Sequence, residues 1–182
     1  MPFLIGIIVL VVILAVWAIG VYNSLVTLRE RVDNAKAQIV TQIESRWDAV
    51  KSLIEATKQY SSHEAEVLES VTASRASIGR GSSVSEIEKD QGQLDSVLGR
   101  LIAVSEAYPD LKASTVYKDT MASINKYEDN VRNSRMIYND TVTRYNRMLK
   151  VFPSSIIAGM FNFEARDYFE GSETKKDMPS WE

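Results

Sequence analysis

Two Tyr-Asn pairs are the residues in this sequence whose types and spacing first suggest chemistry. Tyr138-Asn139 and Tyr145-Asn146 lie seven residues apart, in a chain with no cysteine and a single histidine. A catalytic pair of this kind needs a nucleophile with a base beside it, and these pairs offer none. Seven residues are two helical turns, so we interpret the tyrosines as packing residues. We expect the amides of the two asparagines to reach a neighbouring helix.

The single histidine is the other candidate for chemistry. His63 is followed by Glu64 and Glu66, and imidazole and carboxylate groups are common metal ligands. Their spacing matches no zinc motif, and adjacent residues on a helix do not share a face. The lack of cysteine removes disulfides and thiolate sites as well. We therefore predict no catalytic residue, no cofactor and no metal site.

Charge and length narrow the classes of partner. The 182 residues carry a net charge of -3, with acidic and basic residues interspersed along the chain. No cluster of five or more Lys and Arg is present, which argues against a surface for nucleic acid. The length suits one domain of ordinary size with an appendage.

The appendage is the N-terminal segment. Residues 3–21 contain no charge, and as a helix they would cover about 28 Å, close to the hydrocarbon core of a bilayer. Trp17 and Tyr22 near its far end suit the membrane interface. The alternative is a cleaved signal peptide, but no basic residue precedes the run and only 16–18 resembles a cleavage site. We predict a transmembrane anchor at residues 1–22.

The side of the membrane follows from the bases after this segment. Arg29, Arg31 and Lys36 follow within twenty residues, against Glu30 and Asp33. Because the positive-inside rule counts bases alone, the remaining chain is expected in the cytoplasm.

The body of the chain has the pattern of long helices. Between Gly20 and Gly79 there is neither glycine nor proline, so nothing separates the anchor from the first helix of the body. Its apolar face begins at steps of three and four with Leu25, Leu28, Val32, Ala35 and Ile39. Ser61 with Glu64 resembles a capping box, which predicts a kink and a second segment reaching about Ile78.

A second long helix is predicted after the turn at residues 79–83. Ser83 and Glu86 have capping-box spacing, and an apolar stripe follows them. Gly92 and Gly99 flank this stripe, seven residues apart. Either they are tolerated at a cost of about 1 kcal/mol each relative to alanine, or they allow a neighbouring helix to approach closely.

A third long helix follows a corner at Pro109. Its seam has steps of four and three throughout: Tyr117, Met121, Ile124, Glu128, Val131, Arg135, Tyr138, Val142, Tyr145, Leu149 and Phe152. Phe152-Pro153 is expected to end it. The predicted fold is all-α, an N-terminal transmembrane helix running into an elongated antiparallel helical bundle at residues 23–170. Residues 171–182 are predicted to be a flexible tail.

Charged residues lie at apolar positions of these seams. Glu128 and Arg135 do so in the third helix and Arg46 in the first, and a charge is rarely buried without a partner. We expect Arg46 to contact Glu128, and Arg135 to take a carboxylate such as Glu55 or a tyrosine hydroxyl. Such pairs add little net stability but define the register of a long bundle.

The order of these features resembles the LemA family. An apolar helix is followed by Tyr22-Asn23-x-Leu25-Val26, then by Arg46-Trp47-Asp48, and the resemblance covers nearly the whole chain. The further matching motifs are Lys58-x-Tyr60-x-x-His63-Glu64, Ala107-Tyr108-Pro109-Asp110-Leu111-Lys112-Ala113, Glu128 with Arg135, Tyr138-Asn139, Tyr145-Asn146 and Phe152-Pro153. The resemblance implies a bacterial protein of the inner membrane, an elongated antiparallel bundle with no established enzymatic activity.

The apolar C-terminal segment raises the question of assembly. Beyond Pro153 lie Ile156, Ile157, Met160, Phe161, Phe163, Tyr168 and Phe169, and this much apolar surface needs cover. The segment either folds back onto its own bundle or covers a neighbouring subunit. Because parallel anchors concentrate copies in one membrane, we predict a homo-oligomer.

Three functions are compatible with these features. The first is a structural or interaction protein that assembles at the membrane with itself or with other membrane proteins. The second is an accessory or adaptor subunit of a membrane protease or an envelope-stress pathway. The third is an enzyme that uses His63 and neighbouring carboxylates. The anchor, the long seams and the lack of a catalytic constellation favour the first.

Overall fold

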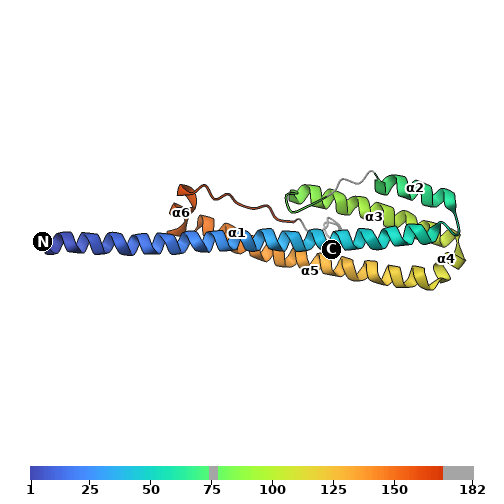
Figure 1. The fold of residues 1–182 in the computed structure, drawn as a ribbon, viewed down its shortest axis with the longest axis horizontal. Coiled ribbons are helices and arrows are strands. Elements are labelled where there is room, and N and C mark those ends of the chain that lie inside the picture. The colour runs from blue at the N-terminus through green and yellow to red at the C-terminus, as the bar shows by residue number, and fades with distance from the viewer. Residues whose placement is uncertain (74–77, 170–182) are drawn as a thin grey trace, which may run out of the picture.

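The computed structural model describes residues 1–73 and 78–169, and every regular element in those ranges is a helix. The helices are α1 (Pro2–Thr57), α2 (Ser62–Ala73), α3 (Val84–Ala107), α4 (Pro109–Ala113), α5 (Thr115–Lys150) and α6 (Ser154–Met160). They form one elongated rod, with α1 along its length and the N-terminus at one tip (Figure 1). The predicted all-α fold is confirmed, whereas the predicted tail at 171–182 lies outside the described residues.

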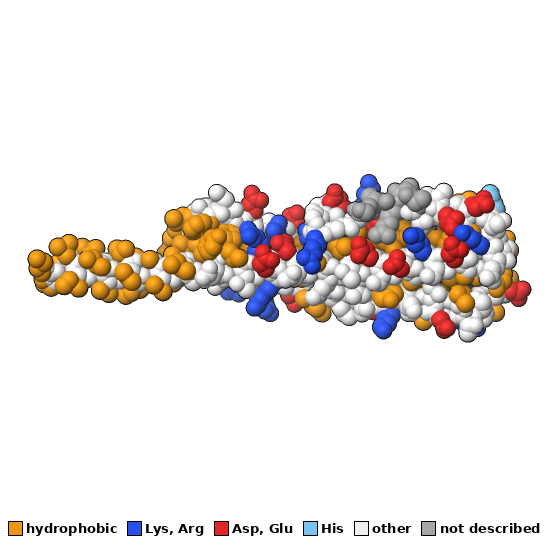
Figure 2. All heavy atoms as spheres, viewed as in Figure 1, with side chains coloured by type: hydrophobic (Ala, Val, Ile, Leu, Met, Phe, Trp, Pro, Cys, Tyr) orange, Lys and Arg blue, Asp and Glu red, His pale blue; other side chains and the backbone are white. Residues whose placement is uncertain are grey.

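α1 joins the apolar segment to the bundle without a break. It has 56 residues, or about 84 Å at the helical rise. An 18-residue window of it has a mean hydropathy of 3.2 with no residue buried, so the helix is long and apolar enough to cross a membrane. Its first buried side chain is Leu25. The apolar end therefore stands free of the bundle (Figure 2), and the predicted continuous rod is present.

The chain reverses direction after α1. The carbonyl of Thr57 accepts hydrogen bonds from the N–H groups of Tyr60 and Ser61, both at 2.9 Å. α2 then runs back beside α1 and buries Ala65 and Leu68 (Figure 1). The predicted second segment after Ser61 is present as α2, but the chain reverses there instead of kinking, and this reversal lets α2 cover α1. As a result α3 runs parallel to α1, and α5 runs antiparallel to both. The described part of α2 ends at Ala73, and residues 74–77, just before the predicted end near Ile78, lie outside the described residues.

The turns before and after α3 are as predicted, whereas one interpretation of its two glycines is not. Ser83 Oγ accepts from the Glu86 N–H at 3.2 Å while Glu86 Oε2 accepts from the Ser83 N–H at 2.7 Å, so the predicted capping box is present. Pro109 begins the short α4. A Cβ added at Gly92 or Gly99 would meet no atom within 4 Å. The alternative of a closely approaching helix at these glycines is therefore wrong.

α5 makes the most extensive contact with α1. Its buried seam residues are Tyr117, Ile124, Val131, Tyr138, Val142 and Tyr145. Phe152, which the seam was expected to include, is 76% exposed. α5 ends at Lys150, so the side chain of Phe152 no longer follows the helical seam.

The C-terminal segment folds back onto its own chain. α6 packs on α1 and α5 at the end of the bundle nearest the free apolar helix, opposite the α4 corner (Figure 1). Residues 163–169, which we call the strap, then run back along the bundle in an irregular extended conformation. Phe169 at the end of the strap is buried. Ile156, Met160 and Phe161 remain exposed.

Candidate functional site

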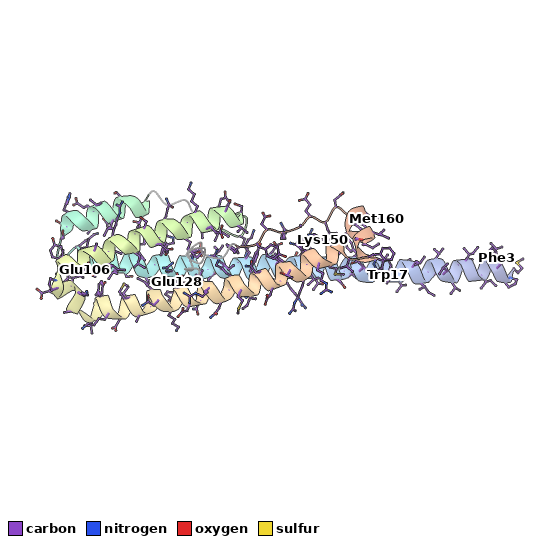
Figure 3. The ribbon with its side chains drawn as sticks, turned by 180° about the vertical axis from the view of Figure 1, so that it is seen from behind. Phe3, Trp17, Glu106, Glu128, Lys150 and Met160 are labelled. Carbon is purple, nitrogen blue, oxygen red and sulfur yellow. The ribbon has the colours of Figure 1, made fainter. Side chains whose placement is uncertain are left out.

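A buried arginine links the three long helices. Arg46 Nη1 of α1 lies 2.6 Å from Glu128 Oε2 of α5 and 2.9 Å from Asp95 Oδ1 of α3. The contact expected between Arg46 and Glu128 is therefore present. Asp95 was not expected as a partner from the sequence, because it lies outside the apolar stripe of its helix. Figure 3 labels Glu128 inside the part of the rod where these helices run together.

The geometry of this cluster is that of an ion pair. The Arg46 side chain is only 5% exposed, whereas the Glu128 side chain is 33% exposed and keeps part of its hydration. Among the described residues, Arg46 Nε and Nη1 and Glu128 Oε2 have no partner at hydrogen-bonding angles. A buried guanidinium is costly to desolvate, so such a pair contributes more to the register of the helices than to net stability.

A second buried polar contact joins α1 to α3. Trp47 Nε1 donates to Asp90 Oδ2 at 2.8 Å, and both residues are buried. A buried indole N–H needs an acceptor, so the carboxylate holds the ring in one orientation. Sequence reasoning missed this pair. A signal was present, since Asp90 lies three residues after Ile87 and four before Leu94, on the buried face of α3.

Arg135 pairs with a carboxylate, as expected, but with Glu88 of α3 instead of Glu55. Its Nη2 lies 2.8 Å from Glu88 Oε1, and its Nη1 donates to Gln91 Oε1 at 3.2 Å. The guanidinium also lies 5.0 Å from the centre of the Phe169 ring. The expected partner Glu55 instead contacts Lys58 at 3.2 Å. The difference follows from the reversal after α1, which places α3 opposite this part of α5.

The two asparagines of α5 bind the strap. Asn146 Nδ2 donates to the Arg166 carbonyl at 2.8 Å, and Asn146 Oδ1 accepts from the Arg166 N–H at 2.9 Å. Asn139 makes the same two bonds with Phe169, at 2.9 and 3.0 Å. The expectation that these amides reach a neighbouring helix is wrong. An asparagine side chain carries an NH₂ donor and a carbonyl acceptor, so it can pair with both the C=O and the N–H of one extended residue.

The spacing of the asparagines fits this role. Seven helical residues rise about 10.5 Å. Three extended residues, the separation of Arg166 from Phe169, cover about 10 Å. The two amides of one helix therefore meet two backbone positions of the strap without strain. Arg166 Nη2 also lies 3.4 Å from Asp33 Oδ1, which ties the strap to α1.

The two tyrosines of the pairs are buried, as packing residues are. Tyr138 donates from its hydroxyl to the Asp167 carbonyl at 2.9 Å, and its ring lies 5.0 Å from that of Phe169. Burial raises the pKa of Tyr138 to about 12. Burial raises the pKa of Tyr145 as well. Both phenols are therefore neutral at ordinary pH and do not act as bases.

Aromatic contacts join α1 to the start of the strap. The Tyr22 ring lies 4.7 Å from that of Phe161 and 5.8 Å from that of Phe163. The Arg29 guanidinium lies 5.6 Å from the centre of the Phe163 ring. Tyr22 thus has partners within the chain, and the predicted position of Trp17 and Tyr22 at a membrane interface stays a prediction.

Known proteins are similar in sequence to this bundle. A sequence model of the LemA family matches residues 35–182. The chain belongs to the LemA family. Protein LemA of Metamycoplasma hominis is 26% identical over 165 residues, which is 87% of this chain and 73% of that protein. The resemblance inferred from the motifs is confirmed, and the matched range of this LemA-family chain includes Arg46, both asparagines and the strap.

Magnetosome proteins named MamQ are also among the relatives. Magnetosome protein MamQ 2 of Paramagnetospirillum magneticum is 33% identical over 79 residues, 43% of this chain and 29% of that protein. Magnetosome protein MamQ of Magnetospirillum gryphiswaldense is 23% identical over 174 residues, 81% of this chain and 64% of that protein. The LemA-family chain therefore spans less than two thirds of either MamQ protein. None of these names describes a reaction.

The rest of the surface of this LemA-family chain carries one histidine and one larger hollow among the described residues. His63 is exposed at the start of α2. Within residues 1–73 and 78–169, no group of three or more His, Asp or Glu side chains is placed to hold a metal ion. A hollow of about 690 Å³ lies between α1, Gly79-Arg80 and α5. Half of its lining residues carry amides or hydroxyls, including Asn34, Gln38 and Ser134, and the lining also includes Glu44 and Arg80.

Proposed function

We propose that this LemA-family chain is a structural and interaction protein of the bacterial inner membrane that assembles with copies of itself and catalyses no reaction. The observation that carries the proposal is the continuity of α1. One helix is fully exposed and apolar at its start and forms the centre of the bundle from Leu25 onwards. Because one continuous helix forms both parts, the anchor fixes the distance and orientation of the bundle relative to the bilayer.

The free end of α1 supports a membrane anchor. Its large apolar side chains from Phe3 to Val16 are each 44% or more exposed. Soluble monomers rarely expose an apolar patch of this size to water, so lipid is the natural cover. From Tyr22 to Thr57 the same helix extends about 54 Å further. The bundle is then a stalk that presents its sides to partners at a distance from the bilayer.

The use of the buried polar groups supports a role without catalysis. Arg46 pairs with two carboxylates, Trp47 with Asp90, and the asparagine amides with the strap backbone. Each of these contacts holds one element against another. A catalytic group would instead face a cleft with its reactive atoms accessible to a substrate.

The charge distribution supports a cytoplasmic bundle. Arg29 and Arg31 follow the apolar run in the sequence, and exposed Arg147 and Lys150 occupy the last turn of α5, beside α6. Arg29 and Arg31 are close enough to the apolar run for the positive-inside rule to count them, and Arg147 and Lys150 add positive charge at the same end of the bundle. Protease added to spheroplasts is expected to leave the bundle intact. Digestion in sealed spheroplasts would reverse the orientation.

Self-assembly is supported by apolar residues on the outside of α5. Met136 and Ile137 are both exposed near the middle of the rod. Parallel anchoring in one membrane raises the effective concentration of such surfaces. Cross-linking in native membranes should give species that contain this chain alone. A chain that stays monomeric at high density in nanodiscs would contradict self-assembly, and a second protein in stoichiometric amount would instead support the adaptor role.

A further inference from the structure

We propose that α6 forms a second contact with the bilayer, an apolar ledge that lies in the interfacial layer beside the anchor. The ledge consists of Phe152, Ile156, Met160 and Phe161. The inference rests on the proposed function in that α1 must span the membrane. The ledge is a second surface for lipid, and it would contact phospholipid at the level of the headgroups.

α6 has two different faces. Ile157 and Ala158 are buried against the bundle. Ile156 is 51% exposed and Met160 is 70% exposed, and the two lie one turn apart on the opposite side. Phe152, just before the helix, and Phe161, just after it, are exposed as well. A seven-residue helix with this much uncovered apolar surface needs a partner.

The position of the ledge along α1 identifies that partner. Ala18 and Val21 are the first residues of α1 that pack against the core. Tyr22 contacts Phe161 at a ring distance of 4.7 Å. Ala18 and Val21 belong to the last turn of the apolar run, 3–21. The ledge is therefore level with the end of the segment that spans the hydrocarbon core.

The figures show this register directly. Met160 lies at the same height along the rod as Trp17, while Phe3 marks the far tip (Figure 3). The apolar side chains of α6 continue the apolar surface of the free helix (Figure 2). A run of 19 residues covers about 28 Å, which is close to the hydrocarbon thickness. With that run in the bilayer, the ledge cannot be far from the interface.

The surroundings of the ledge favour phospholipid over a second copy of the chain. Exposed Arg147 and Lys150 lie in the turn of α5 that precedes it, and Lys150 lies further from the apolar tip at Phe3 than Met160 does (Figure 3). Basic residues at this height meet lipid phosphates, and Trp17 and Tyr22 are of the types enriched at membrane interfaces. A ledge held by lipid in addition to the anchor would set the rotation and tilt of the rod.

The test uses the lack of cysteine in the chain. The full chain with Met160→Cys is labelled with an environment-sensitive fluorophore and reconstituted in vesicles of phosphatidylcholine and phosphatidylglycerol. Quenching is measured with lipids that carry a nitroxide near the headgroup, with lipids that carry it deep in the acyl chain, and with iodide in the water. Ile156→Cys repeats the measurement on the same face. Ser123→Cys, exposed on α5 in the part of the rod far from α6, is the water-facing control.

The expected result is a several-fold stronger quenching by the shallow nitroxide at positions 160 and 156 than at 123, with several-fold weaker quenching by iodide. Equal access of iodide at 160 and 123 would overturn the proposal. Protection from both nitroxide and iodide would also overturn it, since a second copy or another protein would then cover the ledge. A label at Val9→Cys, quenched by the deep nitroxide, reports on the anchor separately. Loss of that signal would contradict the proposed function rather than the ledge alone.

Discussion

The two halves of the bundle are held together in different ways. In the half far from the free apolar helix, α1 is surrounded by α2, α3 and α5, and buried polar side chains pair with other side chains. In the half near that helix, α1 and α5 continue with the strap as their third member. There the side chains of Asn139 and Asn146 pair with backbone.

The lengths of the helices explain the difference. α5 has 36 residues and α3 has 24, so α5 is about 18 Å longer at the helical rise. A strap of seven extended residues covers about 23 Å, enough to fill this gap. Extended chain cannot satisfy its backbone groups alone, so the two amides supply the missing partners. One heptad seam can therefore pack against a helix at one end and against an extended segment at the other.

The largest expected effect is in the half held by side-chain pairs. Replacing both Asp95 and Glu128 by alanine leaves the buried guanidinium of Arg46 without a carboxylate, and we expect a loss of about 3–5 kcal/mol in the free energy of unfolding. Denaturation followed by tryptophan fluorescence measures it, because Trp47 is buried nearby. Glu128→Ala alone should cost clearly less, since Asp95 remains. A double variant as stable as the parent would show that this half does not depend on the cluster.

The next effect concerns the strap. Asn139→Ala with Asn146→Ala removes four hydrogen bonds, and at about 0.5–1 kcal/mol each the strap should lose about 2–4 kcal/mol of docking free energy. Amide hydrogen exchange should accelerate at Arg166 and Phe169 and stay unchanged in α3. Asn130→Ala is the matched control, because Asn130 donates to Gln42 in the other half. Faster exchange across the whole bundle would mean that the two halves do not unfold independently of each other.

A smaller effect depends on pH. The unfolded chain ionises Tyr138 near pH 10, whereas burial raises the pKa in the folded chain to about 12. Between pH 10 and pH 12 the phenol stays protonated in the folded chain but ionises in the unfolded chain. The contribution of Tyr138 to the free energy of unfolding is therefore fully present below pH 10 and is lost as the pH rises to 12. We expect a loss of about 1–2 kcal/mol, measured by denaturant titration at several alkaline pH values. Tyr138→Phe should flatten the slope, though not abolish it, because burial also raises the pKa of Tyr145. An unchanged slope in this variant would rule out Tyr138 as the source.

The smallest effect concerns the glycines of α3. Since a Cβ at Gly99 meets no atom within 4 Å, Gly99→Ala should stabilise the bundle by about 0.5–1 kcal/mol through the unfolded chain. Thermal unfolding of Gly99→Ala and of Gly92→Ala should show similar small increases in Tm. A destabilised variant would indicate a partner on the outer face of α3, as in an oligomer.

Local features of the fold could be predicted from the sequence. The capping box at Ser83, the corner at Pro109 and the unbroken α1 each depend on residues within a few positions of one another. The contact of Arg46 with Glu128 was also predictable, because each charge lies at an apolar position of its own helix and a buried charge needs a partner. Helical periodicity reports which side chains turn inward, and that information is local.

The tertiary structure decided which neighbour each inward side chain meets. The reversal at Thr57 places α3 parallel to α1, so Arg135 meets Glu88 rather than Glu55. The shortness of α3 leaves room for the strap, so Asn139 and Asn146 meet backbone rather than a helix. The periodicity of α5 is the same whether a helix or an extended segment packs against it, because the same face of α5 is buried in both cases. The direction of the chain after a turn, and the length of each partner, are set by packing between residues far apart in the sequence.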